Sequence, residues 1–177
     1  MKKSAFLLLI FSMLFSVVYA ENAPLYVLNE SNINDVYEEV KNGVMNCENV
    51  DVRKEIRGVV VSVKLLNPES EYYRITPELN KTLSCVEYFL AKIKNPVIIE
   101  VHTKKVPDGI KMKNWEFSSV IAGKIGDMFV KKRPKISAER IYPVGYGEFM
   151  PLINTSNNGG NDGDRIDIII QSSISGE

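Results

Sequence analysis

Three runs of β-branched and apolar residues, separated by two amphipathic segments, constrain the fold of this chain most strongly. The runs span residues 57–66, 97–101 and 165–170, and such runs are typical of strands in a sheet. Between them, apolar residues recur at every third or fourth position in residues 77–93 and 114–132, which is the spacing of a helix with one buried face. The chain therefore predicts strands that alternate with helices packed against them.

The weaker segments complete this pattern. Thr76-Pro77-Glu78 combines an N-cap, a first-turn proline and an acidic side chain, so a helix begins there. Residues 31–44 predict a further helix, residues 49–53 a short strand, and residues 140–146 a strand that Pro143 favours at a sheet edge. Because strand–helix–strand units favour parallel neighbours, we expect an α+β fold in which a mixed β-sheet carries helices on one face, in the order β-α-β-α-β-β.

The N-terminus has the three-part layout of a secretory signal peptide. Lys2 and Lys3 precede an almost wholly apolar run over residues 5–18, and Val18-Tyr19-Ala20 resembles a cleavage site. The run is shorter than the roughly 20 residues of a membrane-spanning helix, which favours cleavage over an uncleaved membrane anchor. We expect a signal peptide at 1–20, a lead segment and helix at 21–50, one domain at 51–172 and a tail at 173–177.

Charge balance and reactive side chains argue against several classes of protein. The 22 basic and 22 acidic residues leave no excess positive charge for binding nucleic acid. His102 is the single histidine, no nucleophile motif accompanies it, and no cysteine–histidine spacing fits zinc; we therefore predict no enzyme, no cofactor and no metal site. Cys47 and Cys85 are compatible with a disulfide in an oxidising compartment and equally with two buried thiols.

Several segments, taken in order, resemble the OmpA-like peptidoglycan-associated domain. They are Arg57-Gly-Val-Val-Val-Ser-Val63, Val97-Ile-Ile-Glu-Val-His-Thr103, Asn114-Trp-Glu-Phe-Ser118, residues 140–151 and Arg165-Ile-Asp-Ile168. The third segment and the loop with Pro107 are most similar to MotB-like members of the family. The resemblance covers about residues 51–172. It implies a domain that binds the peptide stem of peptidoglycan, with diaminopimelate as the anchor.

The chain departs from the family where the ligand's charges are met. The family places an aspartate after the His-Thr pair for the ammonium, and an arginine in the second motif for the carboxylate. Here Lys104 and Ile121 stand at those positions, and the family's closing Asn-Arg-Arg reads Gly163-Asp164-Arg165. The resemblance implies a pocket formed by His102, Thr103, Lys104, Asn114, Ser118, Ile121 and Arg165, whereas Trp115 is expected to pack rather than to bind.

Two functions follow from this departure. The first is a non-catalytic envelope protein that associates with peptidoglycan, in which Lys105, Asp108 or Asp164 replaces the missing pair. The second is a degenerate OmpA-like domain that binds another protein in an envelope complex. An ion-conducting stator role is not predicted, because the N-terminal apolar run contains no acidic residue. The expected location is the periplasm or cell envelope of a diderm bacterium; outer-membrane association and a homodimer are compatible with the sequence, and membrane contact would need an uncleaved signal.

Overall fold

The structure, a computed structural model of the 177-residue chain, describes residues 33–64, 75–132, 136–150 and 164–171. The expected signal peptide, the lead segment before α2 and the tail lie outside these ranges. In chain order the elements are α2 (Ile33–Gly43), β1 (Val50–Glu55), β2 (Gly58–Lys64), α3 (Pro77–Leu90), β3 (Val97–His102), α4 (Asn114–Lys131), the 3-10 turn η1 (Ala138–Arg140), β4 (Ile141–Gly147) and β5 (Arg165–Ile170). The predicted helices and strands are confirmed to within a few residues.

The start of α3 follows the predicted capping chemistry. Thr76 is extended, its hydroxyl oxygen accepts a hydrogen bond from the Leu79 N–H at 3.2 Å, and Pro77 occupies the first helical position. The cap satisfies one of the backbone donors that the first turn of a helix leaves without a partner. The sequence pattern therefore sets the boundary of this helix locally.

The five strands form one mixed sheet in the order β1-β2-β5-β3-β4. Strands β3 and β4 pair in parallel, as the crossover through α4 favours, whereas the other neighbours pair antiparallel. Strands β2 and β3, which α3 connects, run in the same direction but are not neighbours, because β5 lies between them and pairs antiparallel with both. Strand β4 lies at the edge, which confirms the position expected from Pro143.

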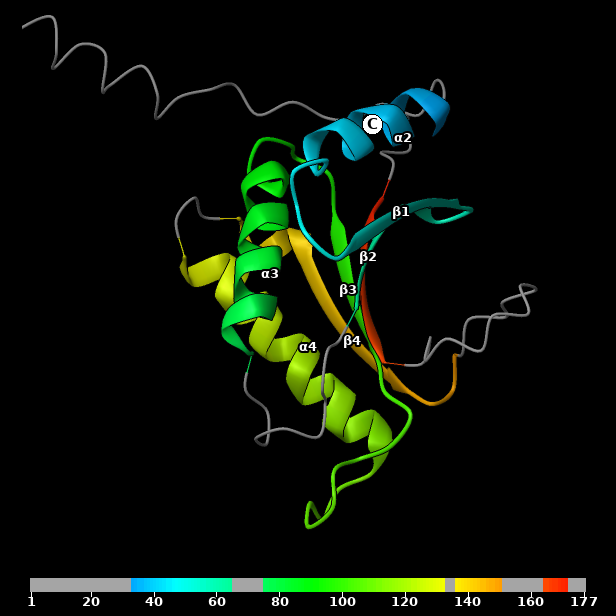
Figure 1. Cartoon of the computed structure of the whole chain (residues 1–177), viewed down its shortest axis with the longest axis vertical. Helices are drawn as coiled ribbons and strands as arrows, with labels where there is room; N and C mark the ends of the chain where they lie inside the picture. Colours follow the sequence, from blue (N-terminus) through cyan, green and yellow to red (C-terminus); the bar gives the residue numbers. More distant parts are fainter. Residues whose placement is uncertain (1–32, 65–74, 133–135, 151–163, 172–177) are drawn as a thin grey trace, which may run out of the picture.

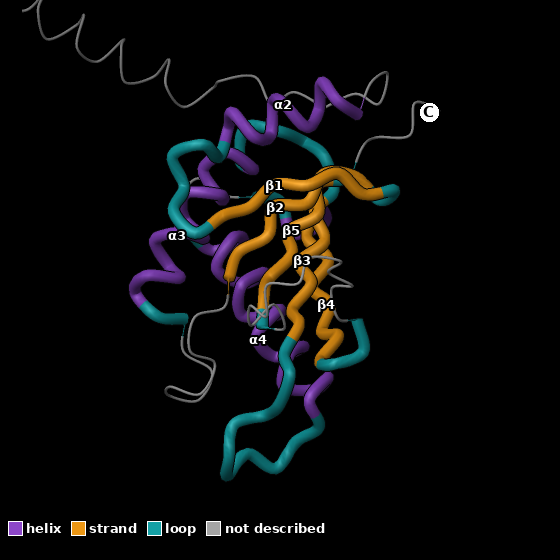
Figure 2. The backbone as a smooth tube through the Cα atoms, turned by 45° about the vertical axis from the view of Figure 1, so that its right-hand side comes forward, coloured by secondary structure: helices purple, strands orange, loops and turns teal. Residues whose placement is uncertain are grey.

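Helices α3 and α4 lie on one face of the sheet, and α2 lies across one end (Figures 1 and 2). Alternate residues of the three central strands point to the helices and form a single core. These residues are Val59, Val61, Val63, Val97, Ile99, Val101, Ile166, Ile168 and Ile170. Because side chains alternate along a strand, the intervening residues of β3 and β5 face away from the helices. Those intervening positions carry Glu100, His102, Arg165 and Asp167.

Helix α4 lies very close to the edge strand because two glycines of β4 leave room for its backbone. A Cβ atom on Gly145 would lie 2.1 Å from the Ser119 backbone nitrogen. Gly147 has a φ of +55°, a conformation that few residues other than glycine adopt. The two positions bring the end of β4 against the first turn of α4.

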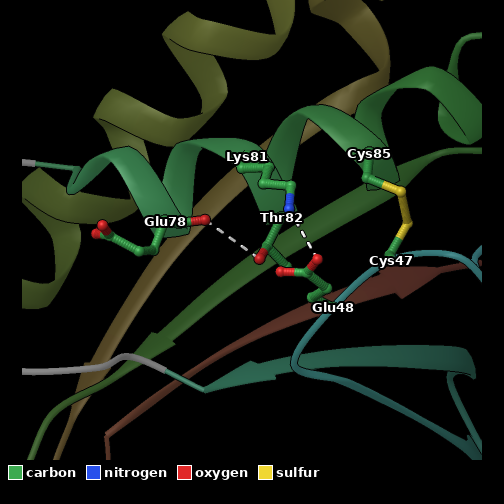
Figure 3. The surroundings of a disulfide bond; sticks show 6 residues. All are labelled: Cys47, Glu48, Glu78, Lys81, Thr82 and Cys85. Carbon is green, nitrogen blue, oxygen red and sulfur yellow. Dashed lines mark hydrogen bonds and ion pairs between the residues drawn. A yellow bond between two sulfur atoms is a disulfide. The ribbon is translucent and has the colours of Figure 1, made fainter.

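A disulfide ties the N-terminal helix to the rest of the fold. Cys47, shortly after α2, is bonded to Cys85 of α3 across 38 residues of sequence. Beside the bond, the Lys81 ammonium lies 2.7 Å from a carboxylate oxygen of Glu48, and both side chains are largely exposed (Figure 3). Of the two states that the sequence left open for the cysteines, the structure has the disulfide. Among the helices described, none is both long and apolar enough to cross a membrane.

Candidate functional site

Four of the residues expected to line a pocket meet at the end of β3, where the following loop turns back into α4: Thr103, Lys104, Asn114 and Ser118. The Thr103 hydroxyl donates a hydrogen bond to the Asn114 side-chain oxygen at 2.5 Å, and the Asn114 amide donates to the Thr103 carbonyl at 2.7 Å. The Thr103 N–H donates to the Gly147 carbonyl at 3.1 Å. These bonds join the ends of β3 and β4 to the start of α4.

Ser118 completes this junction from the next turn of α4. Its hydroxyl accepts a hydrogen bond from the Gly147 N–H at 2.9 Å and donates to the Trp115 carbonyl at 3.0 Å. Ser118 and Thr103 are both fully buried. Their polar groups are thus engaged within the protein, and they hold the frame of the site rather than offer bonds to a ligand.

Lys104 and Asp164 meet at the rim of this junction. The Lys104 N–H donates a hydrogen bond of 2.7 Å to a carboxylate oxygen of Asp164, across 60 residues of sequence. The side chain of Lys104 is exposed and Asp164 is half-buried. The resemblance expects a carboxylate on residue 104. In the structure the carboxylate beside the backbone of residue 104 comes from Asp164.

Ile121 lies on the other side of the frame, in the core. It is 9% exposed and belongs to the same apolar cluster as Phe117 and Ile125. Ile121 has no polar group, so it offers no partner for a carboxylate. Trp115, at the first turn of α4, is 44% exposed, so it packs less than the sequence suggested.

His102 and Arg165 do not join the other expected site residues. They are directly paired in register across β3 and β5, and their side chains occupy the sheet face opposite the helices. The candidate site is therefore split in two. Thr103, Lys104, Asn114 and Ser118 lie at the end of the sheet, whereas His102 and Arg165 belong to a separate, buried cluster on the face opposite the helices.

The cluster opposite the helices, formed by Glu100, His102, Arg165 and Asp167, is a network of buried charges centred on Asp167. Its carboxylate accepts hydrogen bonds from Arg53 at 2.8 Å, from Arg165 at 2.8 Å and from the Ser62 hydroxyl at 2.6 Å. Burial alone would raise the pKa of Asp167, but the bonds from Arg53 and Ser62 and the charge of Arg165 outweigh it and hold that pKa below its usual range. Asp167 is consequently ionised although it is only 2% exposed.

Glu100 is the register partner of Asp167 on β3 and is equally buried. Two carboxylates directly opposite each other repel, and Arg57 offsets this repulsion with two hydrogen bonds to the Glu100 carboxylate. Burial alone would raise the pKa of Glu100, but the nearby His102 and the bonded Arg57 outweigh burial and lower it. Both acids of this pair therefore carry charge inside the protein.

This network was not predicted, although the sequences of β3 and β5 contain a signal for it. Glu100 and Asp167 each interrupt an otherwise apolar strand, and Arg165 is two residues from Asp167. Charged residues at alternate positions of buried strands are costly unless they are paired, so each one predicts a partner. Arg53 could not have been named as that partner, because 114 residues separate it from Asp167.

Solved structures of other proteins have a similar fold. No protein-family profile and no curated protein matches the sequence. Among solved structures, a MotB-like protein from Desulfovibrio vulgaris superimposes with a TM-score of 0.65 at 18% identity, over 80% of this chain and 91% of that one. The chain has an OmpA-like, MotB-like fold.

Two further structures support the same OmpA-like fold. The cell wall anchor of the T6SS from Pseudomonas aeruginosa has a TM-score of 0.58 at 17% identity, over 78% of this chain and 97% of that one. The periplasmic domain of MotB from Helicobacter pylori has a TM-score of 0.60 at 12% identity, over 73% of this chain and 85% of that one. At such identities the likeness establishes the fold, and the chemistry of the site has to be argued from this chain's own residues.

Proposed function

We propose that this protein is a non-catalytic cell-envelope protein whose OmpA-like domain associates with peptidoglycan through an altered pocket. The observation that carries the proposal is the carboxylate of Asp164, held at 2.7 Å on the backbone N–H of Lys104. An ammonium group of a peptidoglycan stem needs an acid partner, and residue 104 no longer provides one. Asp164 supplies the same charge from the neighbouring segment.

The frame around that carboxylate supports the proposal. The hydrogen bonds among Thr103, Asn114, Ser118 and Gly147 fix the end of β3 against α4, so Asp164 is held against a rigid backbone rather than a loose loop. For the ligand's carboxylate we assign Lys105, which is exposed in the loop that follows Thr103. A lysine binds as a point charge and lacks the bidentate geometry of an arginine, so we expect weaker binding than in a domain with both family residues.

The location belongs to the same proposal. The signal-peptide layout of residues 1–20 supports export, and the disulfide between Cys47 and Cys85 supports an oxidising compartment, where such bonds persist. The cell wall anchor from Pseudomonas aeruginosa and the periplasmic MotB domain from Helicobacter pylori carry the same fold. Together these observations favour the periplasm as the place of action.

The test is sedimentation of the purified protein with insoluble diaminopimelate-type peptidoglycan, with free diaminopimelate as competitor. Asp164→Asn removes the charge and keeps the shape of the side chain. Losing one charged hydrogen bond is worth about 1.5–3 kcal/mol, which is roughly a 10- to 150-fold loss of affinity. Asp35→Asn, on α2 at the opposite end of the domain (Figure 1), is the matched control and is expected to bind normally. Equal binding by Asp164→Asn and the unmodified protein would contradict the proposed site.

A second function is favoured by the position of Ile121. Because this side chain belongs to the apolar core, the carboxylate half of the family's pocket is absent, and a degenerate domain that binds an envelope protein is the alternative. A Lys104→Asp, Ile121→Arg double variant restores the family pattern. If only the double variant sediments with peptidoglycan, the geometry of the pocket is intact but the unmodified protein no longer binds peptidoglycan. Binding of an envelope protein then replaces peptidoglycan association as the proposed function.

A further inference from the structure

Three potential ligand atoms converge on the sheet face opposite the helices, next to the proposed peptidoglycan site at the end of β3. The His102 Nε2 atom lies 3.6 Å from Oδ2 of Asp167 and 3.7 Å from Oε2 of Glu100. One ligand atom from each of the three residues lies within 4.8 Å of the other two. All three residues are 2% exposed. Strands β3 and β5 bring them together, since Glu100 and Asp167 are register partners and His102 is two residues further along β3.

Around this cluster one guanidinium nitrogen of Arg165 lacks a partner, and among the three possible ligands the group left unexplained is the imidazole of His102. Among the residues that the structure describes, neither of its ring nitrogens has a hydrogen-bond partner. A buried polar group without a partner is costly and calls for a bound water or ion. The ring is held in place by Tyr146, which stacks on it with centroids 5.3 Å apart and planes 8° from parallel. Nε2 is thereby fixed between two ionised carboxylates.

We propose that Glu100, His102 and Asp167 bind a divalent transition-metal ion, for which Zn²⁺ is the best match. Zinc binds histidine nitrogen and carboxylate oxygen at about 2.0–2.2 Å, so two ligands of a tetrahedral site lie about 3.4 Å apart. The distances of 3.6 and 3.7 Å from His102 are close to this value. One nitrogen and two oxygens suit zinc better than calcium or magnesium, which prefer oxygen alone.

The arginines around the cluster set both its geometry and its affinity. Arg57 holds Glu100, whereas Arg53 and Arg165 hold Asp167, and partners of this kind orient metal ligands. With Glu55, which pairs with Arg53 and Arg57, the network contains three guanidinium groups and three carboxylates. A divalent ion would add two positive charges to a balanced network, so we expect micromolar rather than nanomolar affinity.

The single histidine makes the proposal directly testable. Protein prepared without an affinity tag, freed of metal with a chelator and then dialysed, is titrated with ZnCl₂ in a calorimeter. In parallel, the long-range proton–nitrogen spectrum of ¹⁵N-labelled protein reports on His102 alone, because the chain has no other imidazole. We expect saturable binding of one equivalent of Zn²⁺ and a shift of the Nε2 resonance that follows the same isotherm.

The His102→Gln variant separates this site from non-specific binding at surface acids. It removes the imidazole, and we expect at least a tenfold loss of Zn²⁺ affinity, whereas Asp35→Asn, which removes an exposed acid on α2, binds Zn²⁺ normally. Unchanged Zn²⁺ affinity in folded His102→Gln would overturn the proposal. If that variant does not fold, the unmodified protein decides the matter, since an Nε2 resonance that saturating ZnCl₂ leaves unmoved would also overturn it.

Discussion

Removal of the Cys47–Cys85 bond is the perturbation whose cost the structure allows us to work out most directly. The bond closes a loop of 38 residues that contains the whole β1–β2 hairpin. The loop-closure entropy of the unfolded chain then gives about 13 cal/mol/K, or about 4 kcal/mol at 25 °C. For a domain of this size each kcal/mol corresponds to about 2–4 °C in Tm. We therefore expect the Cys47→Ala, Cys85→Ala variant to melt about 8–16 °C below the oxidised protein.

The assay is urea unfolding followed by circular dichroism, supported by thermal melts at matched pH. The oxidised protein, the reduced protein and the double alanine variant are compared, and the last two should agree. Lys81→Ala is the local control because it removes the exposed ion pair with Glu48 beside the disulfide. Exposed pairs of this kind contribute about 0–1 kcal/mol, so Lys81→Ala tests whether any change near the bond has the same effect.

The expected loss of stability comes from the entropy that the unfolded chain gains when the disulfide is removed. If reduction lowers the free energy of unfolding by less than about 1 kcal/mol, the entropic account of this bond is refuted. Loss of α2 alone would give a different result, namely a separate early transition before the main one. A single transition at a lower urea concentration is the outcome that supports the argument.

Three further predictions concern the packing, acid–base chemistry and capping of the helices. Gly145→Ala in β4 would place a Cβ atom 2.1 Å from the Ser119 nitrogen and should destabilise by about 1–3 kcal/mol in urea melts. Its control is Gly123→Ala in α4, where the added Cβ atom meets nothing within 4 Å, and this variant should gain about 0.5–1 kcal/mol. Glu87 is buried, and desolvation raises its pKa despite the attraction of Lys132; its contribution to stability is therefore present below about pH 4 and is lost as pH rises through the raised pKa. Glu87→Gln should consequently be more stable than the unmodified protein at pH 7 and lose that advantage at pH 4 in melts across this range. Thr76→Ala should cost about 1 kcal/mol in the same urea assay by removing the α3 cap.

The local elements of this fold could be predicted from sequence because their causes are local. Three examples are the cap at Thr76, the apolar stripe of α4 and the β-branched run of β2. Each of these patterns is set by residues that are close together in the sequence. The place of β5 between β2 and β3 could not be predicted, since strand order depends on which surfaces fit after the chain has collapsed. The rule that favours parallel neighbours held for β3 and β4 and failed for β2 and β3.

Some of the residues expected at the site lie together in the structure, and others do not. Asn114 and Thr103 do meet, and Asp164 was among the residues considered as substitutes for the missing acid. The resemblance placed His102 in the same pocket as Thr103, but strand alternation turns the side chain of His102 to the sheet face opposite the helices. That alternation was readable in advance, whereas the bonds from Arg53 and Arg57 to this face depend on tertiary contacts.

The central place of β5 has a consequence for how the chain can acquire its structure. Strands β1 and β2 form one pair and β3 and β4 another, and no backbone pairing joins the two pairs until Arg165–Ile170 inserts between them. A chain that emerges from a ribosome or a translocation channel in N-to-C order exposes four strands and two apolar edges before this strand arrives. Such intermediates are prone to aggregate. The sheet therefore closes only once β5 is present, and until then β2 and β3 each keep an unpaired edge.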